Sequence, residues 1–298
     1  WDYEQFMQQI QDTSWHDELG DPPVHGLMWI TEDRDNLVWW NRETGAIYMK
    51  FTAASGNMFH GTTGLGSDFA FLDGMIWITK EGSFGVSRID LMRDEAWYIT
   101  TAHQKYLGGI SERNDANGYS GSYNTIGIIN NTVTSIGATR DPDLTDEFGR
   151  PKHWWAVGTA AGASFYNPIA NAIYDYGTVN HQISVSDEGV IADVAISTQD
   201  ILEYWRSIFT IYANLSGADA RWINTGADAL DLAWADAAVM LLPAILDGRS
   251  WASGGPQMWL ASDEGVYVIH SHPSDAGGEG GLIRLDEAYA SPYMKGDI

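Results

Sequence analysis

The chain has 298 residues, 44% of them hydrophobic and 12% aromatic, and its 40 acidic against 16 basic residues give a formal charge of −24. Such a surface repels the phosphates of nucleic acids and of anionic membranes, and no run of 18 apolar residues could cross a bilayer. The lack of cysteine excludes disulfides, thiol nucleophiles and thiolate metal sites. Length alone allows two ordinary domains or one large all-β domain, and 32 glycines favour strands joined by turns.

Residues 1–25 are predicted to form a lead-in segment before a single main domain that spans 26–298. Tyr3, Phe6 and Ile10 recur at near-helical spacing, which indicates a short helix or an irregular segment. The alternative is the end of a preceding domain. The chain starts at Trp1 and has no signal peptide, so we expect a mature or trimmed piece of a longer protein.

Residues 26–52 read as the first repeat, a meander of three strands. Its apolar runs cover 26–31, 37–40 and 46–51, and polar turns separate them. Because the first run is apolar at consecutive positions, we expect that strand to be covered on both faces.

Residues 69–100 form the clearest repeat. It begins with a hairpin at Asp73-Gly74, a dipeptide whose two residues both accept positive φ. The four expected strands are 69–72, 75–79, 86–91 and 96–100. Four antiparallel strands in so short a stretch are typical of one propeller blade.

The third repeat, near 123–177, is interrupted by polar sequence. We expect a long loop at 101–122, a hairpin at 126–136 centred on Asn130-Asn131, and a polar excursion at 141–152. Its remaining strands are expected at 154–159, 163–166 and 172–176.

Two further repeats are predicted near 183–225 and 229–290. The first is ambiguous, because apolar residues there also fit one helical face: Ile201, Trp205, Ile208 and Tyr212. We favour a degenerate blade. The last repeat contains a hairpin at 257–269 and an outer strand at 281–285.

One phrase recurs along the chain at roughly 50-residue intervals, which is typical of a repeat architecture. It consists of Trp, a short apolar stretch, Thr or Ser, and a polar turn that usually contains Gly. Its markers are Trp29, Trp77, Trp155, Trp259, Gly82, Gly162 and Gly265. The pattern predicts an all-β propeller of about five to six four-stranded antiparallel blades with little helix. The repeated tryptophans are expected to pack between blades, and sugar stacking is the alternative.

The best copy, Met258 to Val268, resembles the propeller repeats of two-component-regulator sensors and related extracellular propellers. A shorter similarity joins the closing residues 290–298 to propeller regions of phage virion proteins in tail, fibre or adhesin assemblies. The first resemblance implies the fold. The second implies a virion location, and an extracellular one is the alternative.

Two groups of residues are candidate sites. Trp39 and Trp40 follow a polar turn, so one of them should face outward and could stack on a glycan. Four carboxylates could form a hard-cation loop that binds calcium, although the loop lacks the glycine and distal glutamate of an EF-hand: Asp141, Asp143, Asp146 and Glu147. No other cofactor is expected. His270 and His272 could share a metal, but no third ligand is identifiable.

These observations predict a non-catalytic structural or binding propeller of a phage particle. Its expected partners are neighbouring virion or assembly proteins and a host-surface glycan, and we expect a homo-oligomer within the larger assembly. The alternatives are an extracellular glycan-active enzyme and a sensor-type ligand-binding propeller. No catalytic motif is present, so an enzyme is the weaker hypothesis. A pocket with converging carboxylates, one of them with a raised pKa, would favour it.

Overall fold

The computed structural model describes residues 3–59, 64–80, 82–121, 126–177, 180–185, 189, 191–196, 201–205, 208–210, 220–223, 238–242, 257–262, 265–270 and 282–285. Two helices, α1 (Tyr3–Ile10) and α2 (Ser14–Leu19), precede the strands. Among the described residues, no helix is long and apolar enough to span a membrane.

Within the described part of the chain, twenty strands form five antiparallel sheets, which follow one another along the sequence. The first sheet contains β1 (Gly26–Ile30), β2 (Asn36–Asn41) and β3 (Ala46–Thr52). The second contains β4 (Leu65–Leu72), β5 (Met75–Lys80), β6 (Val86–Asp90), β7 (Glu95–Ile99) and β8 (His103–Lys105). The third contains β9 (Val133–Thr145), β10 (Pro151–Thr159), β11 (Gly162–Asn167) and β12 (Ala172–Tyr176).

The fourth sheet contains β13 (Asn180–Val185), β14 (Ile191–Ile196), β15 (Ile201–Trp205) and β16 (Ala220–Ile223). The fifth contains β17 (Ala238–Leu242), β18 (Gln257–Ser262), β19 (Gly265–His270) and β20 (Leu282–Leu285). Two 3-10 turns complete the described elements, η1 (Ile110–Glu112) and η2 (Ile208–Thr210).

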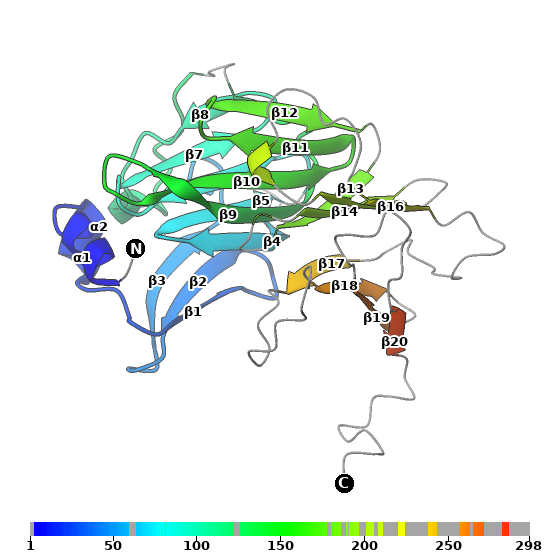
Figure 1. Ribbon diagram of the computed structural model, residues 1–298. Coiled ribbons are helices and arrows are strands. Elements are labelled where there is room, and N and C mark those ends of the chain that lie inside the picture. The colour runs from blue at the N-terminus through cyan, green and yellow to red at the C-terminus, as the bar shows by residue number, and fades with distance from the viewer. Residues whose placement is uncertain are drawn as a thin grey trace, which may run out of the picture.

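The sheets are the blades of an all-β propeller, as the repeats predict. Within each sheet the chain runs up and down through neighbouring strands. The first strand of one sheet contacts the first strand of the next, so β4 lies against β9, β9 against β13, and β13 against β17 (Figure 1). The second to fifth sheets therefore each begin at a shared inner edge and end at an outer strand.

The apolar run of β5 is covered on both faces, because two different cores lie on either side of it. Ile76 and Ile78 belong to the first core, together with residues of the helices and the first sheet. Met75 and Trp77 point to the opposite face and belong to a second core with the third sheet. The alternation of side chains along a strand thus divides one continuous hydrophobic run between two cores.

The same division repeats one sheet further on. Trp155 and Val157 of β10 lie in the core shared with the second sheet. Trp154 and Ala156 lie in the core shared with the fourth sheet, where Ile183 is also buried. Both central strands owe their near-complete burial to this position between neighbours.

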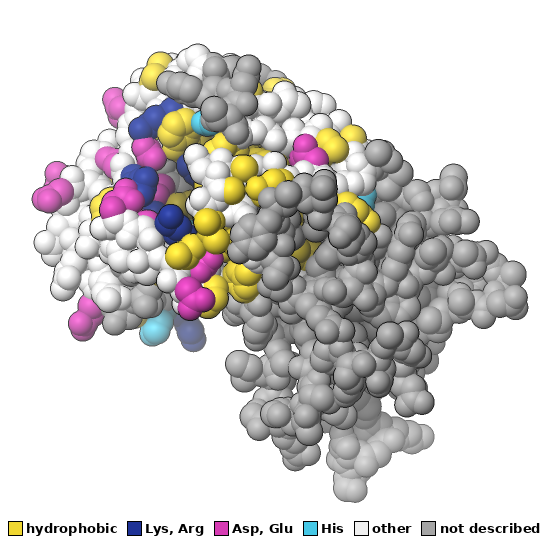
Figure 2. Space-filling view, turned by 45° about the horizontal axis from the view of Figure 1, so that its top comes forward, with side chains coloured by type: hydrophobic (Ala, Val, Ile, Leu, Met, Phe, Trp, Pro, Cys, Tyr) yellow, Lys and Arg dark blue, Asp and Glu magenta, His cyan; other side chains and the backbone are white. Residues whose placement is uncertain are grey.

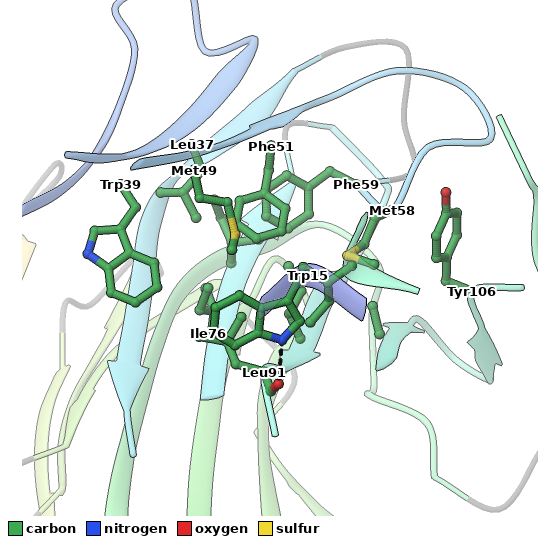
Figure 3. Packing of buried hydrophobic residues seen from close by; sticks show 14 of the residues in the cluster. Trp15, Leu37, Trp39, Met49, Phe51, Met58, Phe59, Ile76, Leu91 and Tyr106 are labelled. Atoms are coloured by element: carbon green, nitrogen blue, oxygen red, sulfur yellow. Dashed lines mark hydrogen bonds between the residues drawn. The ribbon is translucent and has the colours of Figure 1, made fainter. Parts of the chain in front are cut away.

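The two helices close the first core. Figure 3 shows the indole of Trp15 among buried residues of the first two sheets, and its Nε1 donates a hydrogen bond of 2.8 Å to the carbonyl of Leu91. Phe6 and Ile10 of α1 belong to the same core. The expected short helix at the N-terminus is present. The division into a lead-in segment (1–25) and a propeller domain (26–298) stays a prediction.

Polar side chains on the inner strands connect neighbouring blades. The carboxylate of Asp68 on β4 accepts a hydrogen bond from the backbone N–H of Ile136 on β9 at 2.9 Å. One sheet further on, Ser135 accepts the N–H of Ile183 at 2.6 Å. The inner strands of adjacent blades belong to different sheets and do not pair with each other, so these side chains satisfy backbone groups that a ladder would otherwise use.

The first sheet departs from the expectation of two-sided coverage. Leu27 and Trp29 of β1 are 57% and 36% exposed. The strand lies at an edge of its sheet, with β2 as its single partner among the described strands. An apolar run is therefore insufficient for burial when no second layer covers the strand.

Three predicted connections are wrong. The expected loop at 101–122 contains β8 and η1, and it buries Tyr106 and Ile110 in the first core. The expected hairpin at 126–136 is absent, because Asn130 and Asn131 precede β9 rather than lying between two strands. The expected polar excursion at 141–152 consists largely of the ends of β9 and β10, which continue the hairpin outward.

Two other expectations are confirmed. Asp73 and Gly74 both have positive φ, 48° and 74°, in the turn between β4 and β5. In the ambiguous region, residues 201–205 form a strand rather than part of a helix. Tyr212 lies outside the described residues.

Candidate functional site

A cleft of about 440 Å³ lies between the second and third sheets. Strands β5, β6 and β7 line one side and β10 and β11 line the other, while the β9–β10 connection contributes further residues. Both charged and hydrophobic side chains line it. Figure 2 shows a face of the molecule with the same mixture, where basic and acidic side chains lie beside a group of hydrophobic ones.

Two rows of cross-strand neighbours form the facing walls. In the second sheet, Trp77 lies opposite Arg88, and Arg88 lies opposite Trp97. In the third sheet, Trp155 lies opposite Tyr166. Directly opposed residues of antiparallel strands project to the same face. All five side chains therefore line the cleft.

The two tryptophans of the repeat form its deepest part. Trp77 and Trp155 are 0% and 1% exposed and share one core. The ring of Tyr166 stacks on that of Trp155, with centroids 5.2 Å apart and planes at 16°. Neither indole Nε1 has a hydrogen-bond acceptor within the structure. A buried donor without an acceptor costs about 1–3 kcal/mol, so two in one cleft are an unusual feature.

Arg88 adds a third buried donor without an acceptor, its Nε. Its guanidinium lies 5.9 Å from the ring centroid of Trp97, a cation–π distance. Burial lowers the pKa of His103, and the charge of Arg88 lowers it further. Burial raises the pKa of Tyr166, and Arg88 opposes that rise. The arginine thus stands among the aromatic residues of the cleft.

A buried ion pair holds the wall next to the β9–β10 connection. Arg150 donates two hydrogen bonds to Asp90, at 2.9 and 2.8 Å, and also pairs with Asp146 at 2.9 Å. Burial opposes ionisation of Asp90, but the hydrogen bonds and charge of Arg150 outweigh it and hold the pKa of this carboxyl below its usual value. The pair fixes the connection against β6.

A second buried carboxylate anchors the other end. Asp73 accepts hydrogen bonds from Arg140 at 2.8 and 2.7 Å and lies 3.1 Å from Nε2 of His153. Although burial opposes ionisation, these partners lower the pKa of Asp73 to about 2. Burial lowers the pKa of His153 below its usual value, and its bond to Asp73 opposes that change. His153 lines the cleft, and its ring lies edge-on to Trp77.

The structure separates the two predicted stacking candidates from this cleft. Trp39 is 5% exposed and packs against Tyr48 in the first core, so it offers no free ring face. Trp40 is half-buried on the first sheet, opposite the exposed Leu27 and Ile47. Of the pair, Trp40 is the one with an accessible side chain.

The predicted cation loop is not assembled. Asp141 accepts hydrogen bonds from two backbone N–H groups and from the indole of Trp154 at 2.6 Å. Asp146 and Glu147 pair with arginines, while Asp143 is exposed. Within the described residues, no three His, Asp or Glu side chains converge as metal ligands. His272 lies outside the described residues, and His270 is described only by its backbone.

The repeat markers have different surroundings. Trp77 and Trp155 pack between blades, whereas Trp29 is partly exposed. Trp259 is placed on β18, opposite Val268, and its side chain lies outside the described part of the chain. Gly82 has positive φ in the turn between β5 and β6, Gly162 has positive φ at the start of β11, and Gly265 begins β19.

Sequence reasoning missed Arg88, Trp97 and Tyr166. Their signal is the strand register: counting back along β5 and forward along β6 from the Thr79–Val86 pair places Arg88 opposite Trp77. Two charged residues, Arg88 and Asp90, lie two positions apart on β6, so alternation places both on the cleft-facing side. The partner sheet could not be found in this way, because its approach depends on tertiary packing.

No protein-family model matches the sequence, and no curated protein matches it either. Among solved structures, the extracellular domain of a putative one-component system from B. thetaiotaomicron aligns with 89% of this chain and 29% of its own, at 10% identity and a TM-score of 0.45.

A nidogen/laminin complex aligns with 88% of this chain and 78% of its own, at 14% identity and a TM-score of 0.41. An auxiliary nutrient binding protein from Bacteroides thetaiotaomicron aligns with 84% and 53%, at 7% identity and a TM-score of 0.40. At this level of similarity we draw no ligand, partner or location from these proteins.

Proposed function

We propose that this propeller is a non-catalytic binding module that takes a glycan into the cleft between its second and third sheets. The observation that carries the proposal is the set of three buried N–H donors without acceptors on Trp77, Arg88 and Trp155. A ligand rich in oxygen acceptors would satisfy these donors. Tyr166 supplies an aromatic ring beside them, and sugars combine apolar faces with many oxygens.

The carboxylates support binding rather than catalysis. Glycosidases need a carboxyl whose pKa is raised enough to donate a proton. Among the described residues, burial raises the pKa of Asp68 and Asp175, and neither lines the cleft. Asp90 lines it with a lowered pKa and is tied to Arg150. This arrangement suits a rigid wall better than a proton donor.

The setting follows from the sequence similarity alone. Residues 290–298, which suggest a phage tail, fibre or adhesin, lie outside the described part of the chain. We propose a virion or other extracellular location, where a cleft of this kind would meet host-surface glycans. The homo-oligomer within a larger assembly and the contacts with other virion proteins are proposals of the same kind. Detecting the chain in purified particles by mass spectrometry tests the location.

The binding proposal is tested on an array of immobilised glycans with the wild-type chain and two single variants. Tyr166→Ala removes the aromatic ring of the cleft, and Trp40→Ala removes the accessible tryptophan of the first sheet. We expect Tyr166→Ala to weaken binding at least about fivefold, because one stacked ring contributes on the order of 1–3 kcal/mol. Trp40→Ala should bind as the wild type does.

The opposite pattern of binding in the two variants would assign the glycan site to a different sheet. Loss of binding in Trp40→Ala with full binding in Tyr166→Ala would place the glycan on the first sheet. Failure of the folded wild type to bind any glycan, in the array and in calorimetry, would overturn the proposal. Circular dichroism of each variant separates loss of binding from loss of folding.

A further inference from the structure

The charges that line the cleft are mostly paired with one another. Asp90 and Asp146 share Arg150, and Glu147 pairs with Arg93. The fourth carboxylate of the lining, Glu95, is bound by Lys105. Each acidic residue of the cleft therefore has a cationic partner within the protein.

Arg88 is different. No carboxylate lies within 4.0 Å of its guanidinium nitrogens in the described part of the chain, and its Nε has no acceptor. It is held in place by the aromatic ring of Trp97 and by its position between Trp77 and Trp97 in the sheet. The charge of Arg88 helps to lower the pKa of Asp90, but the two groups form no ion pair in contact. A positioned arginine with no carboxylate in contact is a recognition group for an anion, because its planar fork matches a carboxylate.

The N–H donors near Arg88 indicate which chemical group of a ligand would bind there. Indole N–H groups only donate, and so does a guanidinium. A hydroxyl that accepted their hydrogen bonds would bring its own hydrogen into the same crowded space, whereas a carboxylate brings acceptors alone. Trp77 and Trp155 therefore favour the same kind of group as Arg88.

The overall charge limits the size of the anion. The chain carries −24, and this field repels a polyanion that extends over the surface. At physiological ionic strength, salt screens this repulsion beyond about 8 Å. The binding of a single negative charge inside the cleft therefore depends mainly on the residues next to it. A ligand with one carboxylate on a largely neutral body fits both conditions.

We infer that the glycan bound in this cleft carries a carboxylate, which Arg88 receives between the buried indoles of Trp77 and Trp155. This inference rests on the proposed function, since it names the class of sugar that the same cleft binds. The expected ligands are uronic-acid-type or sialic-acid-type sugars, and the carboxylate is the chemistry that they share.

The test uses glucuronic acid and glucose, which differ by a carboxylate in place of a hydroxymethyl group. Titration calorimetry of the full chain should show glucuronate binding at least about tenfold more tightly than glucose. The preference should fall to within about twofold in Arg88→Met. Arg88→Lys keeps the charge but loses the fork, and we expect an intermediate value.

Two controls distinguish a specific role of Arg88 from a general effect of positive charge or of anion binding. Arg42→Met removes an exposed arginine from the turn after β2, far along the chain from the cleft, and should leave the preference unchanged. Excess inorganic sulfate should not displace glucuronate, because sulfate lacks a sugar body. If sulfate competes fully, Arg88 is a general anion site and the inference fails.

The outcomes distinguish the two proposals. If glucose and other neutral sugars bind in a Tyr166-dependent manner and glucuronate has no advantage, the binding function stands and the carboxylate inference is wrong. If neither acidic nor neutral sugars bind, the function itself fails. A preference for glucuronate that persists in Arg88→Met and Arg88→Lys, both folded by circular dichroism, would also overturn the inference.

Discussion

The first and second sheets carry the same tryptophan phrase, yet its environment differs completely between them. Trp77 is fully buried on the second strand of its sheet, whereas Trp29 is 36% exposed on the first strand of its own. In the second sheet an inner strand, β4, precedes the phrase and the third sheet covers it. Burial of the repeated tryptophan is thus set by its neighbours rather than by the phrase.

The largest effect should come from truncating the two tryptophans. Trp77→Ala removes a fully buried ring at the junction of two sheets and should lower the free energy of unfolding by about 3–5 kcal/mol. Trp29→Ala removes a partly exposed ring and should cost less than about 1 kcal/mol. Urea unfolding followed by circular dichroism measures both.

Trp77→Phe sharpens this comparison. It keeps most of the buried volume and removes the Nε1 that has no acceptor, so it should cost clearly less than Trp77→Ala. Equal losses of unfolding free energy in Trp77→Ala and Trp29→Ala would show that the two tryptophans do not differ in burial as described.

A second comparison concerns one glycine from a hairpin turn of each sheet, Gly45 between β2 and β3 and Gly74 between β4 and β5. Gly45 and Gly74 have nearly equal φ, 70° and 74°, so alanine at either position carries the same backbone strain of about 1 kcal/mol. A methyl group at Gly45 meets open space, whereas at Gly74 it would come within 2.6 Å of the ring of Phe6. We expect Gly45→Ala to cost about 1 kcal/mol and Gly74→Ala about 2–3 kcal/mol.

The double variant Gly74→Ala with Phe6→Ala tests the cause. If contact with Phe6 is responsible, the part of the Gly74→Ala loss in unfolding free energy that exceeds the loss at Gly45 should disappear in the Phe6→Ala background. A penalty at Gly74 equal to that at Gly45 in the wild-type background would show that α1 does not restrict the turn.

Much of the fold could be predicted from the sequence, because local signals carried it. The Asp73-Gly74 turn and the consecutive apolar residues of β5 are short-range features, and both predictions are confirmed. The exposure of β1 could not be predicted, because its run looks the same as that of β5 and differs only in the layers around it.

The candidate site was harder to predict for a related reason. Arg88 and Tyr166 lie 78 positions apart and meet only because two sheets face each other. Trp39 and Trp40 were proposed together, because alternation along one strand predicts that one of the two faces outward but cannot reveal a cleft. The carboxylates of 141–147 suggested a metal, whereas tertiary contacts assign Asp141 and Asp146 to turns and ion pairs.

The smallest effect is a difference in pH dependence between the first hairpins of the two sheets. Asp73 has its pKa lowered to about 2 from 3.8 by His153 and Arg140, against the effect of burial. A lowered folded pKa stabilises the protein above the unfolded value and loses that effect as pH falls. We expect Asp73 to contribute at most about 2 kcal/mol above pH 4, and progressively less as the pH falls towards 2.

The comparison with Asp73→Asn isolates this contribution from the other carboxylates. The gap in unfolding free energy between wild type and Asp73→Asn should narrow as pH falls from 5 to 2.5. Asp33, in the β1–β2 turn, has its pKa lowered chiefly by the hydroxyl of Thr31 but is fully exposed to solvent. Its variant Asp33→Asn should show a much weaker narrowing, because solvent screens the interaction. A gap for Asp73→Asn that stays constant over this range would mean that Arg140 and His153 do not hold the carboxylate ionised, and the junction between the second and third sheets would then depend on packing alone.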